Sequence, residues 1–198
     1  MQHEQVHELL YQALETELGG IHVYHTALRC AIHPALKDEW QQYVEQTETH
    51  AQLLRDLCAT LQLNPDQETP GRQVVRHLGQ SLVTAMEMAL DAGPPEAAQL
   101  VATGCVVLAE TTDHLHWELL REVAEALKGA AGKAVHATYQ QVEDEEDAHL
   151  YHTTGWSREL WIASLGLPAV LPPPEEEKDV KTAIGAARAK QARKAMLK

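Results

Sequence analysis

The chain has 198 residues, with 29 Asp or Glu against 16 Lys or Arg, 12 His and no Phe. A chain of this length forms one domain, with room for a tail, and it can bury a sizeable core. The net charge of −13 disfavours a body that lies along nucleic acid or an anionic membrane, because these partners are negative too. Ala and Leu dominate while β-branched and aromatic residues are scarce, which predicts an all-α fold.

Cysteine usage and the lack of apolar runs predict a cytoplasmic protein. Cys30, Cys58 and Cys105 are odd in number and show no CxxC spacing, which is typical of reduced thiols. The first residues do not read as a signal peptide, and no window reaches the roughly 18 apolar residues of a membrane span. We therefore expect no membrane partner.

Pro, Gly and Asn divide the chain into segments of helical character, in which apolar residues recur at intervals of three and four. The expected helices span residues 3–32, 34–63, 73–90, 96–127 and 133–165. Each pair of long helices around a tight break forms an antiparallel hairpin. The short third helix then lies in the crossover of an antiparallel four-helix bundle.

The C-terminal part of the chain differs from the body in composition. Residues 1–166 are predicted to form the bundle, and residues 167–198 a Pro-rich spacer with a basic helical tail. Residues 178–198 carry a local net charge of +6, whereas the body is acidic. Such a tail could contact nucleic acid or another anionic partner. Alternatively, it docks on the acidic body of its own or a neighbouring subunit.

Each long helix carries acidic or His residues on its apolar face. The inward positions, read from the spacing of the apolar residues, are Glu17, His50, Glu110, His114, Glu146 and His149. Glu17 and His50 are equidistant from the first helix break, and Glu110 and His149 are equidistant from the break before the last helix. Antiparallel helices place such pairs at the same height, so these side chains are expected to share one layer.

A shared layer of carboxylates and imidazoles predicts a metal centre. An unpaired buried carboxylate is costly, whereas one divalent cation compensates several of them. Glu146 and His149 form a Glu-x-x-His motif, whose spacing lets both side chains reach one point from the same helix face. Ligands of these types suit Fe or Mn and tolerate Zn.

This pattern resembles the ferritin-like di-metal carboxylate proteins, the family of ferritin, bacterioferritin and rubrerythrin. The resemblance covers about residues 3–160, and the crossover helix is similar to that of bacterial stress-associated members. It implies terminal ligands Glu17 and Glu110, a bridging Glu146, and nitrogen ligands His50 and His149. Tyr24, two turns after Glu17, matches a tyrosine often found beside such sites, which makes it the candidate catalytic residue.

One ligand of the family pattern is missing. A second Glu-x-x-His is expected on the helix of His50, but the position three residues before it is Thr47. The nearby glutamates of this helix point away from the His50 face. His114 or the adjacent Asp113 could supply a substitute ligand. The site is therefore expected to hold two Fe ions or only one, with Mn or Zn as alternatives.

Other polar and aromatic residues have simpler interpretations. The tryptophans, including Trp117, are expected to pack in the core. The acidic residues 144–145 are expected to face solvent. Most of the remaining histidines, including His116 and His152, are expected at the surface, although a supporting role around the metal is the alternative.

Three functions are compatible with this sequence. The first is a di-metal oxidoreductase that acts on Fe(II) with O2 or peroxide and depends on an unidentified electron donor. The second is a non-catalytic iron-handling stress protein, which Thr47 makes more plausible. The third is a metal-free helical interaction protein. We also expect a homodimer, and whether the protein is an enzyme stays open at this point.

Overall fold

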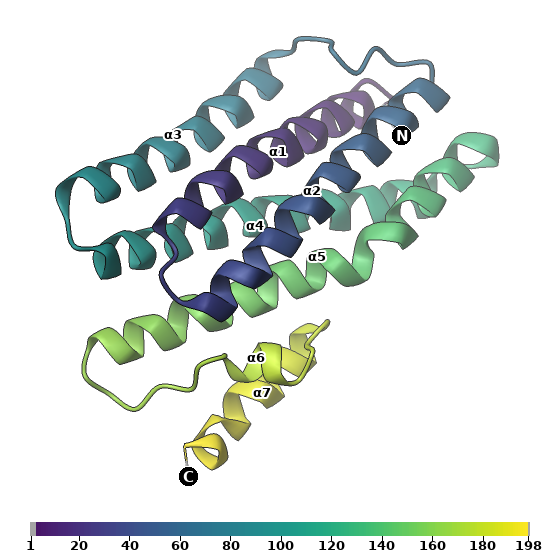
Figure 1. The fold of residues 1–198 in the computed structure, drawn as a ribbon. Coiled ribbons are helices and arrows are strands. Elements are labelled where there is room, and N and C mark those ends of the chain that lie inside the picture. Colours follow the sequence, from purple (N-terminus) through teal and green to yellow (C-terminus); the bar gives the residue numbers. More distant parts are fainter. Residues whose placement is uncertain (1–2, 198) are drawn as a thin grey trace.

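The protein is almost entirely helical. The computed structural model describes residues 3–197, which contain seven helices and no strand (Figure 1). The helices are α1 (His3–Cys30), α2 (Pro34–Thr60), α3 (Pro70–Ala92), α4 (Pro95–Ala126), α5 (Gly129–Ser164), α6 (Pro174–Glu177) and α7 (Ala183–Met196). The predicted all-α class is confirmed. Residues 1–2 and 198, which the predicted domain ranges include, lie outside the described residues.

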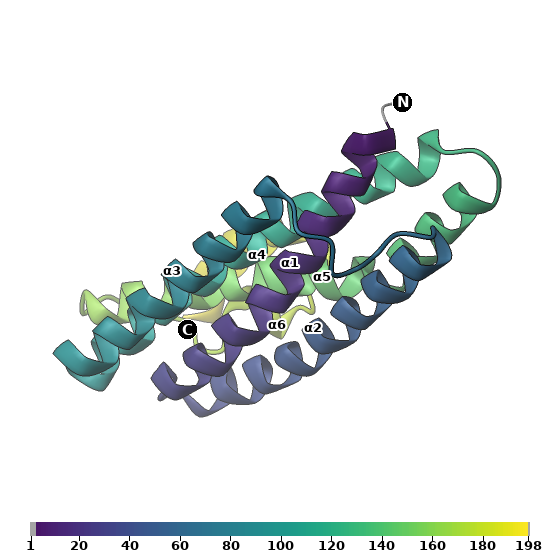
Figure 2. The same ribbon diagram turned by 90° about the horizontal axis from the view of Figure 1, so that it is seen from above.

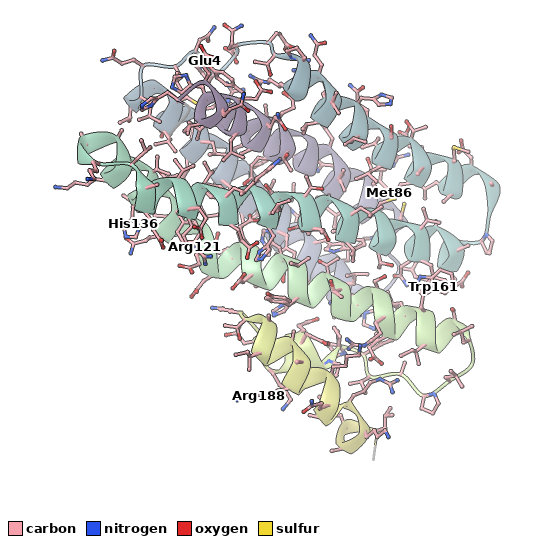
Figure 3. The ribbon with its side chains drawn as sticks, turned by 180° about the vertical axis from the view of Figure 1, so that it is seen from behind. Glu4, Met86, Arg121, His136, Trp161 and Arg188 are labelled. Atoms are coloured by element: carbon pink, nitrogen blue, oxygen red, sulfur yellow. The ribbon has the colours of Figure 1, made fainter. Side chains whose placement is uncertain are left out.

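The four long helices α1, α2, α4 and α5 enclose the interior. α1 packs against α2 and α4, and α5 packs against α4 and α2. These helices lie side by side in two perpendicular views (Figure 1 and Figure 2). α3 packs on the outside of α1 and α4, and the side chain of its residue Met86 is fully buried (Figure 3). Side chains from four helices can therefore meet in a common interior.

Prolines mark the starts of several helices. Pro34, Pro70 and Pro95 each lie in the first turn, where the missing N–H would have no helical partner anyway. The third helix is predicted to begin at residue 73, but it begins at Pro70. The reason is the side chain of Thr69, which caps the helix by accepting a hydrogen bond from the N–H of Arg72.

The break before α5 is shorter than the sequence predicts. The glycines at 129 and 132 suggest an interruption, but α5 already begins at Gly129. The φ of 79° at Gly129 turns the chain, a conformation that favours glycine. Gly132 lies within the helix, and only glycine fits there because a Cβ at this position would be only 2.1 Å from the carbonyl oxygen of Leu127.

The apolar core consists of two clusters along the long helices. Trp40 of α2 belongs to one cluster and Leu54 of the same helix belongs to the other. His50 lies between them, and buried Glu or His side chains occupy the corresponding position on α1, α4 and α5. Burying polar groups costs free energy unless they find hydrogen-bond or charge partners. A ligand bound to this layer would therefore stabilise it.

The C-terminal segment docks on α5 of its own chain. Glu159 of α5 is fully buried and accepts hydrogen bonds from the guanidinium of Arg193 in α7 and from the N–H of Val170. Arg188, in contrast, lies exposed on α7 (Figure 3). Part of the positive charge of the tail is therefore paired within the subunit, as one of the two sequence interpretations expects.

α4 leaves an apolar strip at the surface. Val101, Leu108 and Leu115 recur at intervals of seven along this helix, and each is more than one third exposed.

Among residues 3–197, no helix has the length and apolar character that are needed to cross a membrane.

Candidate metal centre

Five of the six predicted metal ligands meet in the interior. They form two overlapping groups, and within each group one ligand atom per residue lies within 4.8 Å of the others. The groups are Glu17, His50 and Glu146, and Glu110, Glu146 and His149. We refer to these five side chains as the centre. Glu146 belongs to both groups, a position from which one carboxylate could bridge two cations.

The centre is almost completely shielded from solvent. Its most exposed member is Glu110, at 3%, and Glu17 is 0% exposed. Burial raises the pKa of Glu17 well above its ordinary value, and the neighbouring Glu146 raises it further. The arrangement therefore concentrates carboxyl groups where their negative charge is poorly solvated, which a bound cation would relieve.

Both imidazoles present Nδ1 to the carboxylates. Nδ1 of His50 lies 2.7 Å from Oε1 of Glu146 and 3.8 Å from Oε1 of Glu17. Nδ1 of His149 lies 3.6 Å from Oε2 of Glu110 and 3.9 Å from Oε1 of Glu146. The two rings are stacked, with their centroids 5.8 Å apart. The potential nitrogen ligands thus lie next to each other, and both are close to Oε1 of Glu146.

Several atoms that face each other in the centre lack a hydrogen-bond partner within the described part of the chain. They are Oε2 of Glu17, Nδ1 of His50, Oε2 of Glu110, and both carboxylate oxygens of Glu146. Leaving one buried polar atom unpaired costs about 1–3 kcal/mol. Because these atoms converge and are of the oxygen and imidazole types, the centre could hold a metal ion.

The second ring nitrogen of each imidazole, Nε2, is also in a hydrogen bond. Nε2 of His50 donates to Oε2 of Glu145 at 2.8 Å, and Nε2 of His149 donates to Oε1 of Gln46 at 2.9 Å. Carboxylate and amide oxygens can only accept, so these contacts place a hydrogen on Nε2. In the neutral ring, Nδ1 then keeps a lone pair for a cation.

In the metal-free protein a proton compensates part of the negative charge. Burial alone would lower the pKa of His50, but the nearby carboxylates of Glu146, Glu17 and Glu145 raise it to about 9. The imidazole of His50 is therefore protonated at neutral pH when no cation is bound. Since only the deprotonated nitrogen binds a metal ion, a cation would displace this proton.

Two aromatic side chains position the carboxylates of Glu110 and Glu17, each of which belongs to only one ligand group. The O–H of Tyr24 donates to Oε1 of Glu110 at 2.6 Å, and the Nε1–H of Trp117 donates to Oε1 of Glu17 at 2.8 Å. Burial raises the pKa of Tyr24 well above its ordinary value, and Glu110 raises it further, so the phenol keeps its hydrogen. Tyr24, the predicted catalytic residue, is thus in contact with a candidate ligand.

The structure does not bring His114 into either group. Its side chain is 18% exposed, and Nδ1 lies 3.3 Å from Oδ1 of Asp147. The adjacent Asp113 is the buried one, and burial together with the nearby Glu17 raises its pKa well above the ordinary value. Successive residues point about 100° apart on a helix, so the rotation of α4 about its axis decides which of the two faces inward.

Thr47 occupies the inward position one turn before His50. It is 2% exposed, and its Oγ1 donates to the carbonyl oxygen of Tyr43 at 2.9 Å. Its methyl group lies 3.3 Å from the point where a Cβ on Gly20 would be. A small, closely packed side chain without a carboxylate thus stands where the family pattern has a ligand.

Gln46 and Glu145 are functional contacts that the sequence prediction lacks. Glu145 is predicted to face solvent, yet its carboxylate binds the imidazole of His50. The missed signal is reciprocal: Gln46 lies one turn before His50 and binds His149, whereas Glu145 lies one turn before His149 and binds His50. A polar residue one turn before each inward His could therefore have identified both.

Two further histidines are buried although the sequence predicts them at the surface. His116 is 8% exposed and its Nδ1 pairs with the hydroxyl of Thr16 at 3.0 Å. His152 is 7% exposed and its Nδ1 pairs with the hydroxyl of Tyr43, also at 3.0 Å. In both cases a hydroxyl group on a neighbouring helix makes burial tolerable.

Comparison with known proteins does not supply a relative for this chain. No protein-family model, no curated protein and no solved structure matches it. The buried Glu and His groups, which could hold a metal ion, are therefore the feature of the chain that points to a function.

Proposed function

We propose that the protein is a ferritin-like four-helix-bundle metalloprotein whose centre holds two Fe or Mn ions and reacts with O2 or peroxide. The shared position of Glu146 carries this proposal, because its carboxylate belongs to both ligand groups. The packing of α1 with α2 and of α4 with α5, with α3 in the connection between the two hairpins, also supports it.

If the centre held two redox-active ions, they would supply the two electrons that, with two protons, reduce one hydrogen peroxide molecule to two waters. The protein holds Glu17 and Glu110 in place through Trp117 and Tyr24. It keeps Nδ1 of both imidazoles available through Glu145 and Gln46 on their outer side. The electrons must then be returned by an external reductant, whose identity is open.

A non-catalytic iron-handling role is the second candidate. The observation that favours it is Thr47, which leaves Glu146 as the only carboxylate common to both ligand groups among the described residues. With fewer bridging oxygens, a second ion would be held less tightly, and the centre could store or transfer one ion without turnover.

Metal analysis of the purified protein tests the proposal. After reconstitution with Fe(II) or Mn(II), about two ions per chain support the di-metal centre, and about one supports the altered centre. If no metal is retained after exposure to Fe(II) in air, both metal-based functions are wrong.

Peroxide consumption then separates an enzyme from a binding protein. The wild type should consume peroxide faster than Glu146→Ala, while Glu143→Ala, an exposed acidic position on the same helix, should match the wild type. Equal rates for wild type and Glu146→Ala would remove the catalytic role.

A further inference from the structure

A pocket of about 580 Å³ lies between α2, α5 and the C-terminal segment. We call it the acidic pocket, because its lining includes six carboxylates: Asp38, Glu39, Asp144, Glu145, Glu176 and Asp179. Lys181 is the only Lys or Arg among its lining residues, all of which the structure describes. It lies 3.8 Å from both Asp144 and Asp179, so its charge is already shared.

Glu39 lines the acidic pocket and is not fully paired. Its side chain is 8% exposed, and Trp156 donates a hydrogen bond to its Oε2. Its other oxygen, Oε1, has no hydrogen-bond partner among residues 3–197, and the same holds for Oε2 of Glu176. Nδ1 of His152 lies 3.7 Å from Oε1 of Glu39. The pocket therefore contains buried acceptor atoms that lack a positively charged partner.

Glu39 and Glu176 lie against each other. Burial and the neighbouring carboxyl group of Glu176 raise the pKa of Glu39 to about 9. Two adjacent carboxyl groups avoid the repulsion between their negative charges by binding either a proton or a cation between them. Oxygen ligands of this kind select hard divalent cations, which often keep several waters when only one or two carboxylates hold them.

The acidic pocket adjoins the centre. Gln46 and Glu145 line the pocket and also bind the outer nitrogens of His149 and His50. A single layer of side chains therefore separates the pocket from the two imidazoles. The side chain of Glu145 is 40% exposed, so it has room to move toward solvent.

We propose that the acidic pocket is a loading site, where a hydrated divalent cation binds Glu39 and Glu176 before it passes between Glu145 and Gln46 to the centre. This inference rests on the proposed metal centre. Carboxylates in a partly enclosed pocket raise the local concentration of cations and hence their rate of entry. The waters of such a cation can be exchanged for Glu145 and then for the ligands of the centre.

The test uses Mn(II) with the full chain and the double variant Glu39→Gln/Glu176→Gln. Bound and free Mn(II) are counted at equilibrium by electron paramagnetic resonance. The rate of loading is followed by removing loosely held ions on a chelating resin at successive times. The variant should lose a class of weakly bound Mn(II) and load the centre at least about tenfold more slowly. Its final content of tightly bound Mn(II) should equal that of the wild type.

The control is Glu48→Gln/Glu125→Gln, which removes the same charge at exposed positions outside the acidic pocket. It should load like the wild type. If the pocket variant loads at the wild-type rate, the loading site is wrong while the centre stands. If slow loading occurs equally in the control variant, overall charge explains it and the loading site is also wrong. If the wild type holds no tightly bound Mn(II), the proposed centre fails and the loading site fails with it.

Discussion

Oε1 of Glu146 lies 2.7 Å from Nδ1 of His50, yet neither atom has a hydrogen-bond partner among the described residues. A hydrogen bond needs the N–H to point at the acceptor. The two atoms nevertheless form an ion pair when the imidazole is protonated, and they belong to one ligand group. A cation that displaced the proton would replace this ion pair with two ligand contacts, so Glu146 is the first residue to test.

Glu146→Gln should abolish tight metal binding while it preserves the size of the side chain. Because Glu146 serves both groups, its loss should reduce the content of both ions rather than one. The measurement is the metal content after reconstitution with Mn(II) and dialysis. Glu143→Gln, at an exposed position on α5, is the matched control. Full occupancy in Glu146→Gln would show that this carboxylate is not a ligand.

Tyr24→Phe should weaken metal binding without abolishing it. The phenol donates to Oε1 of Glu110, and removing a partner of this kind costs about 10- to 100-fold in metal affinity. The affinity for Mn(II) is measured by competition with a chelator. Tyr151→Phe, on α5 outside the centre, should leave it unchanged. An unchanged affinity in Tyr24→Phe would mean that Glu110 needs no support from this hydroxyl.

The common height of the ligands could be predicted from the sequence because it depends only on the helical rise and on the positions of the breaks. Glu17 and His50, at equal distances from the first break, do meet in one group, and Glu110 and His149 meet in the other. This agreement tolerates errors of a few residues at the helix ends, such as the late start predicted for α5.

Contacts that depend on the rotation of a helix could not be predicted in this way. The choice between Asp113 and His114 rests on about 100° of rotation of α4, which is set by packing against three other helices. The contact of Glu145 with His50 requires the distance between α2 and α5. The spacing of apolar residues identifies only which face of a helix is buried. Glu145 lies at the edge of that face and its side chain is 40% exposed, so the spacing predicts that it faces solvent.

Thr47→Glu should add a carboxylate to the proposed centre at some expense in packing. Thr47 already lies close to Gly20, so a larger side chain should destabilise the metal-free protein by about 1–3 kcal/mol. With saturating Mn(II), the added carboxylate can bind a cation, and the melting temperature should rise more than in the wild type. Thr47→Gln has the same size without the charge. An equal response of both variants to Mn(II) would contradict a ligand role at this position.

Metal binding should also stabilise the wild-type fold. The unpaired atoms of the centre exist as a group only in the folded chain, so a cation binds the folded state preferentially. At a free concentration 100 times the Kd, the expected gain is about 2.7 kcal/mol. Thermal unfolding with and without Mn(II) measures this gain. Glu146→Gln should show little of it, and a shift as large as that of the wild type would place the bound ion elsewhere.

The docking of the C-terminal segment should fail at acidic pH because it depends on ionised Glu159. Burial alone would raise the pKa of Glu159, but Arg193, the N–H of Val170 and Arg158 together hold it below the ordinary 4.5. A carboxyl group with a lowered folded-state pKa contributes stability above its unfolded pKa. That contribution is lost as the pH falls through the lowered value. Hydrogen exchange of α7 should therefore accelerate below about pH 4.5, before that of α1.

Three variants separate this ion pair from general acid unfolding. Arg193→Ala removes hydrogen bonds to a buried carboxylate, which should cost about 1.5–3 kcal/mol of docking energy and release α7 already at neutral pH. Arg188→Ala, at an exposed position on the same helix, should leave exchange unchanged. Glu159→Gln should release α7 at all pH values, because a neutral amide cannot form the ion pair with Arg193 at any pH. If α7 of Glu159→Gln stays protected and still opens below pH 4.5, another acidic group controls the docking.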